Sequence, residues 1–158
     1  MATKKYIEQV RRMERMYQRF KSLNVGVEHT QASPNYDDDV YSFFQNCYHL
    51  KDWIKNDPYC AAWQDVEAFI NSNEDLKICA DLCNSLKHLD LTRPRSTENP
   101  QFHGGAMRLD IHDGSGSSSV KIAMSFNIVT TSQGSIDAFD LATRCVDAWK
   151  NFIAVNDP

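Results

Sequence analysis

The stretch DDDVYSFFQNCYHLKDWIKNDP, residues 37–58, decides the fold class of this chain. Its apolar residues recur at alternating intervals of three and four, as side chains on one face of an α-helix do. The aspartates at its start suit the positive end of a helix dipole, and Asn56, Asp57 and Pro58 end the pattern. We therefore predict an amphipathic helix that runs to about Asn56. Its apolar stripe consists of Val40, Phe43, Cys47, Leu50 and Ile54.

The same spacing continues on both sides of this helix. It predicts helices over about residues 3–22, 59–70 and 73–91, and a last helix that Ser135 caps. Five helices with apolar stripes predict a mainly α fold, a helical bundle that forms a single domain over residues 1–158.

One β-hairpin is predicted before the last helix, over about residues 106–130. Apolar and polar residues alternate in 107–111 and again in 120–128, and the turn-forming sequence DGSGSSS lies between the two runs. Because a hairpin alone is marginally stable in water, we expect its apolar face to lie on the helices.

Composition limits the class of protein. The chain has 42% hydrophobic residues and a formal charge of −4, and it lacks the run of roughly 20 apolar residues that a membrane helix needs. The N-terminus has no signal-type stretch, so we expect a cytoplasmic protein that does not contact the membrane. The five cysteines form an odd set without a CxxC pair, which favours reduced, buried thiols. No cofactor and no metal are predicted.

The first helix is locally basic, because residues 1–21 hold seven Lys or Arg against two Glu. Such a stripe can meet phosphate groups, but the acidic remainder of the chain opposes a general attraction to nucleic acid. We favour a solvated or internally neutralised face.

The fourth predicted helix carries the most concentrated group of polar side chains. At about 100° per residue, Asp81, Asn84 and His88 lie nearly opposite the apolar stripe of that helix, and Lys87 lies to one side. We expect solvent, a cleft or a subunit interface to receive this face. A solvated surface explains it, but histidine also suits proton transfer near neutral pH, and an amide with an ammonium can stabilise an anion.

Residues 83–88, with the sequence CNSLKH, resemble the Arg-Asn-x-x-x-His signature of HEPN-domain proteins. Asn84 and His88 match the signature, whereas Cys83 stands at the Arg position. The broader likeness, a small helical bundle with the signature on a late helix, covers about residues 37–155.

The resemblance implies a metal-independent ribonuclease in which His88 takes part in proton transfer, and a homodimer in which two such helices form one cleft. Cys83 cannot supply the missing cation, and Lys87 is a point charge rather than a bidentate fork. We therefore expect a binding or regulatory module with an RNA or protein partner at the Asn84, Lys87 and His88 face. The alternatives are an endoribonuclease that uses these three residues for catalysis, and an adaptor that acts through the hairpin.

Two further groups are candidate binding residues. His49 and Asp52 face partly away from the apolar stripe of their helix and could meet Asp81 and His88, but no established metal-binding pattern is present. Hydrogen bonding or solvation is therefore the preferred interpretation.

The second group lies in the loop 92–105, where Arg93 and Arg95 could close over a phosphate-containing ligand. We favour a mobile flank for this loop. The sequence contains no P-loop, GxSxG elbow or Rossmann pattern.

Overall fold

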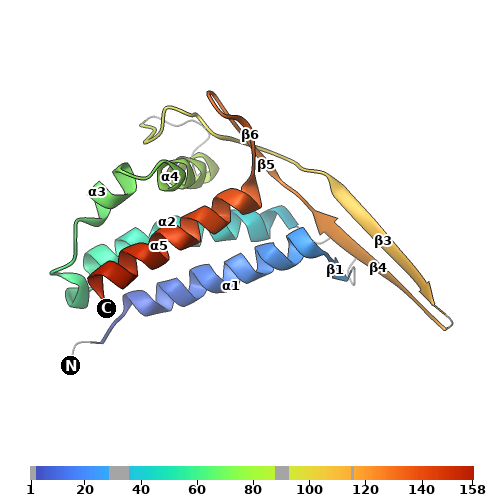
Figure 1. The fold of residues 1–158 in the computed structure, drawn as a ribbon, viewed down its shortest axis with the longest axis horizontal. Coiled ribbons are helices and arrows are strands. Elements are labelled where there is room, and N and C mark those ends of the chain that lie inside the picture. The colour runs from blue at the N-terminus through green and yellow to red at the C-terminus, as the bar shows by residue number, and fades with distance from the viewer. Residues whose placement is uncertain (1–2, 29–35, 88–92, 115) are drawn as a thin grey trace.

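The computed structural model of the chain describes residues 3–28, 36–87, 93–114 and 116–158. Helices form the body of the molecule, and a long β-hairpin projects from one end of it (Figure 1). The helices are α1 (Tyr6–Val25), α2 (Tyr36–Asn56), α3 (Val66–Asn71), α4 (Glu74–Lys87) and α5 (Ala138–Asn156), with a 3-10 turn η1 at Pro58–Cys60. The helical part of the predicted fold is confirmed.

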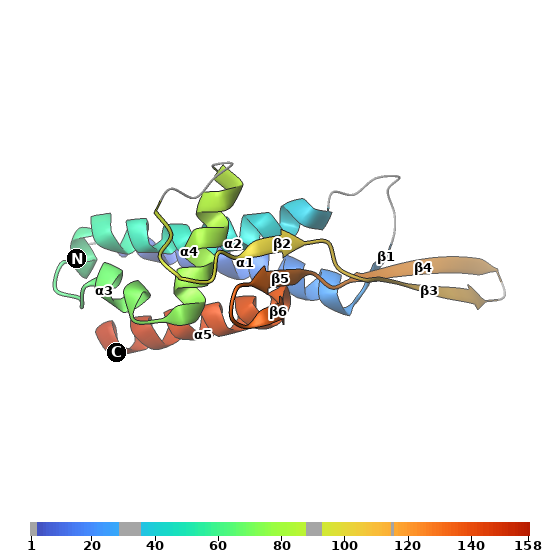
Figure 2. The ribbon, with the colours of Figure 1, turned by 90° about the horizontal axis from the view of Figure 1, so that it is seen from above.

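Helices α1, α2 and α5 extend along the long axis of the body, and α4 crosses above α2 and α5 (Figure 2). The core between them is rich in aromatic rings, and its largest fully buried side chains include Phe20, Phe43, Phe44 and Trp149. Burial of such rings is the main favourable term in folding. Within the described residues, no helix is both long and apolar enough to cross a lipid bilayer.

The β-structure is more extensive than the single hairpin that we predicted. The strands are β1 (Val27–Glu28), β2 (Gln101–His103), β3 (Met107–Gly114), β4 (Ser117–Met124), β5 (Asn127–Thr130) and β6 (Gly134–Asp137). One antiparallel sheet has the order β1-β4-β3 and the other has the order β2-β5-β6.

The predicted strand over 120–128 is divided because Phe126 turns into the core. Its ring lies 6.3 Å from that of Phe20, and its backbone oxygen accepts a hydrogen bond from Ala138 N. The chain crosses itself closely at this point, since a Cβ at Gly105 would lie 1.1 Å from the backbone oxygen of Ser125. Only glycine fits there.

Two predicted helix boundaries are wrong for local reasons. The helix expected over 59–70 is reduced to η1 and the short α3, which Asp65 caps by accepting hydrogen bonds from Glu67 N and Ala68 N. The last helix begins after Asp137, whose side chain accepts hydrogen bonds from Phe139 N and Asp140 N. Ser135, the predicted cap, belongs to β6.

The expectation that the hairpin rests on the helices is also wrong. Met107, Leu109 and Ile111 on β3 are 57%, 52% and 69% exposed, and only the base of the hairpin at Ile122 and Ala123 is buried. Residues 107–114 and 117–124 therefore form a projecting arm with one apolar face, which we call the β-arm.

Candidate functional site

Asp81, the first residue of the predicted polar face of α4, is fully buried. Its carboxylate accepts hydrogen bonds from Arg95 N at 2.7 Å, from Ser96 N at 2.8 Å and from Ser96 Oγ at 2.6 Å. The expectation that solvent or a partner receives this face is therefore wrong for Asp81. The segment after α4 folds back over the carboxylate, which helical periodicity alone cannot indicate.

Arg95 is engaged inside the protein rather than free to bind phosphate. Its guanidinium lies 2.8 Å from Glu67 Oε2, 3.1 Å from Asn71 Oδ1 and 3.2 Å from the Tyr48 hydroxyl. Partial burial acts to raise the pKa of Glu67, but the hydrogen bond from Arg95 and the charge of Lys51 outweigh it and bring that pKa to about 2.

The predicted mobile flank is thus fixed over much of its length. Beyond Arg95, the backbone oxygen of Glu98 accepts a hydrogen bond from Thr131 N at 2.9 Å, and residues 101–103 pair with β5. Arg93 is exposed near the start of this segment.

A compact charged cluster joins α2 to α3 and to the segment after α4. Lys51 Nζ lies 2.8 Å from Asp52 Oδ1 and 3.4 Å from Glu67 Oε1. The Lys51 ammonium and the Arg95 guanidinium lie 4.9 Å and 5.7 Å from the centre of the Tyr48 ring, within cation–π range. These cations are therefore neutralised internally.

The α4 end face, defined as Asn84 and Lys87, is what remains of the predicted site in the described chain. Asn84 is half-buried and Lys87 is exposed, and among the described residues neither side chain makes a hydrogen bond or an ion pair. His88 lies outside the described residues, so its predicted catalytic role stays a prediction.

Helices α2 and α4 pack together, as the sequence suggested. Burial raises the pKa of the Cys83 thiol to about 11. His49 is exposed on α2 and makes no hydrogen bond within the described chain.

The charged cluster between α2 and α3 includes Tyr48, Lys51 and Glu67, and none of them was among the predicted site residues. Lys51 flanks the apolar stripe of α2, and its position one residue before Asp52 was the available signal. Glu67 could not be placed, because its contacts depend on how α3 packs against α2.

The basic stripe of α1 forms a second surface. Arg11, Arg15, Arg19 and Lys150 line a shallow groove of about 580 Å³. Arg15 lies 3.7 Å from Glu8, and Arg19 lies 3.9 Å from Asp39, so part of this charge is neutralised within the chain. Helix α1 lies on the side of the body away from α4 (Figure 1).

The donor groups that suit a metal differ from those considered in the sequence. His49, Asp52 and Asp81 form no group with metal-ligand spacing, whereas Cys47, Cys79 and Cys145 are the one such group in the described part of the chain. All five cysteines are free and buried, as predicted.

No family model, curated protein or solved structure matches this chain. The resemblance to HEPN proteins rests on the sequence of residues 83–88 and on the predicted helices, and it stays a prediction.

Proposed function

We propose that this chain is a HEPN-like binding module that recognises another protein through the α4 end face. One observation carries the proposal. The side chains of Asn84 and Lys87 make no hydrogen bond or ion pair within the described chain, whereas Lys51 and Arg95 are paired within the fold. A half-buried amide and an exposed ammonium on one helix suit recognition.

The chemistry of the face favours binding over catalysis. Ribonucleases with the full signature use a guanidinium to steady the phosphate, and here Cys83 is buried at that position with its pKa raised to about 11. A neutral thiol cannot replace a cation. The nearby guanidinium of Arg95 is paired with Glu67.

The charge of the face favours a protein partner over RNA. Binding to nucleic acid draws on several cations that neutralise phosphates, but Lys51 is paired and Lys87 contributes one unpaired ammonium among the described residues of this face. The basic helix α1 lies across the body from α4 (Figure 1). The HEPN resemblance further supports a homodimer in which two α4 end faces meet.

The test compares two charge reversals of exposed lysines. Lys87→Glu changes the α4 end face, whereas Lys21→Glu makes the same change on α1, where Lys21 has no ion pair within the described residues. We expect quantitative affinity capture to show loss of a specific protein with Lys87→Glu and its retention with Lys21→Glu. Equal retention by both variants would exclude this face.

The enzyme alternative makes an opposite prediction. A metal-independent ribonuclease cleaves single-stranded RNA in EDTA, and His88→Ala abolishes that cleavage without loss of helical circular dichroism. We expect the wild-type protein to leave RNA intact.

A second candidate function rests on the β-arm. Contiguous exposed apolar residues commonly mark interaction surfaces, and Leu109 and Ile111 lie side by side on the apolar face of the arm. An adaptor that acts through the arm loses its partner when both residues become Thr and keeps it with Lys87→Glu. The two variants therefore separate the two functions.

A further inference from the structure

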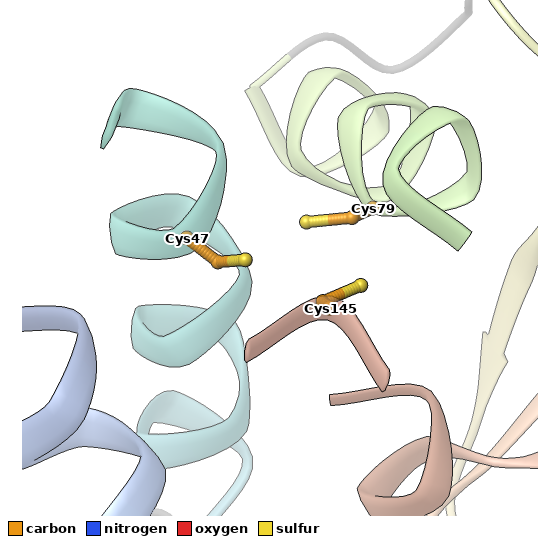
Figure 3. A group of neighbouring side chains, drawn as sticks. All are labelled: Cys47, Cys79 and Cys145. Carbon is orange, nitrogen blue, oxygen red and sulfur yellow. The ribbon is translucent and has the colours of Figure 1, made fainter. Parts of the chain in front are cut away.

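Three cysteines meet in the centre of the body. Cys47 comes from α2, Cys79 from α4 and Cys145 from α5, and their sulfur atoms all lie within 4.8 Å of one another. Figure 3 shows the three side chains turned into the same space between the helices. Their exposed fractions are 0%, 1% and 0%. We call this group the thiol cluster.

The spacing of the thiol cluster suits a metal ion. An ion about 2.3 Å from each of three sulfur atoms in one plane holds those atoms about 4 Å apart, which is within the observed limit. Side-chain ligands that are all sulfur select soft ions such as Cu⁺, whereas a structural zinc site requires four ligands in a tetrahedron. The described residues supply three.

Two thiols of the cluster also contact helix backbone. Cys79 Sγ donates to the backbone oxygen of Phe44 at 3.7 Å, and Cys145 Sγ donates to that of Asp75 at 3.5 Å. These hydrogen bonds are weak, so little is lost when the two thiols give up their protons to bind an ion.

We propose that the thiol cluster binds one Cu⁺ ion through the sulfur atoms of Cys47, Cys79 and Cys145. Binding forms three Cu–S bonds as the three S–H bonds break, and the three protons pass to solvent, because thiolates rather than thiols are metal ligands. No atom changes oxidation state. Three soft thiolate ligands suit Cu⁺ in preference to hard ions.

Because the cluster is fully buried, loading is tested during refolding. Reduced protein is refolded without oxygen in one equivalent of Cu⁺ that is buffered by a chromophoric chelator, and bound copper is then measured together with the midpoint of thermal unfolding. We expect one copper per chain, three protons released per copper, and a higher midpoint than for the metal-free protein.

Matched cysteine variants locate the ion. Replacing Cys47, Cys79 or Cys145 with Ala should weaken copper binding by at least about tenfold, since even loss of an outer-shell partner commonly costs that much. Cys60→Ala and Cys83→Ala, at buried cysteines outside the cluster, should bind as the wild type does.

The wild-type protein alone can overturn the proposal even if some variants fold poorly. X-ray absorption of the copper-loaded protein should show three sulfur neighbours and no nitrogen or oxygen neighbour. No retained copper, a mixed ligand shell, or preference for Zn²⁺ over Cu⁺ under competition would each refute the assignment.

Discussion

Asp81 and Lys87 lie on the same helix, α4, yet the first is buried and the second is exposed. Asp81 is buried under the segment that follows the helix and accepts three hydrogen bonds, whereas Lys87 is exposed and makes no hydrogen bond or ion pair within the described residues. The difference shows that a polar helix face can be divided between holding the fold and meeting a partner. The first role contributes to the free energy of unfolding, whereas the second does not.

The largest effect is expected for Asp81→Ala. The change leaves the buried N–H groups of Arg95 and Ser96 without their acceptor, so we expect a loss of about 3 kcal/mol in the free energy of unfolding. Urea denaturation measures this loss. Asp81→Asn keeps one acceptor oxygen and should lose less, and a loss below about 1 kcal/mol for Asp81→Ala would contradict the structural role.

The second effect concerns the Arg95 guanidinium, which is partly buried against Glu67 at 2.8 Å. Arg95→Met keeps much of the aliphatic stem and removes the charge, so we expect a loss of about 1–2 kcal/mol, between the values for exposed and buried pairs. Denaturation at neutral pH checks this value. A loss in the free energy of unfolding no larger than that for replacing an exposed lysine would mean that the Arg95 guanidinium does not stabilise the fold.

The same ion pair predicts a pH dependence. The pKa of Glu67 is held at about 2, below its ordinary value of 4.5, so its contribution to stability is complete above pH 4.5. The contribution is lost as the pH falls toward 2. Arg95→Met should therefore reduce the difference in stability between pH 5 and pH 2.5, while Lys21→Glu should leave it nearly unchanged.

The apolar residues of the β-arm are likewise divided between buried and exposed positions. Ile122 at the base is buried, whereas Leu109, its cross-strand neighbour on β3, is exposed. We expect the pair of changes Leu109→Thr and Ile111→Thr to alter the free energy of unfolding by less than about 1 kcal/mol, because Thr suits a strand and little apolar burial is lost. A larger loss in urea denaturation would show that the arm packs on the body.

Local patterns account for what the sequence could predict. The three-four spacing placed α2, which buries one stripe in the core, and it also placed α4, although α4 buries every residue from Ile78 to Cys83. The strands β2, β5 and β6 have at most four residues, too few for an alternating pattern to be distinctive. Asp81 was misplaced because its acceptor role depends on Ser96, which lies beyond the end of the helix.

For the candidate site too, the sequence could place some residues and not others. Helical geometry placed Lys87 away from the core, where it is exposed, whereas Asn84 on the same helix is half-buried. The internal pairing of Arg95 follows from the packing of α3 against its neighbours, which no local pattern records.

The smallest effect on stability is expected for Lys87→Glu, and it is the sharpest test of the comparison. Because Lys87 is exposed and unpaired within the described chain, its replacement should change the free energy of unfolding by no more than about 0.5 kcal/mol, chiefly through the helix dipole. The same variant should lose the captured partner protein. If Asp81→Asn lost the partner and Lys87→Glu did not, the recognition surface would lie under the segment after α4 rather than at the α4 end face.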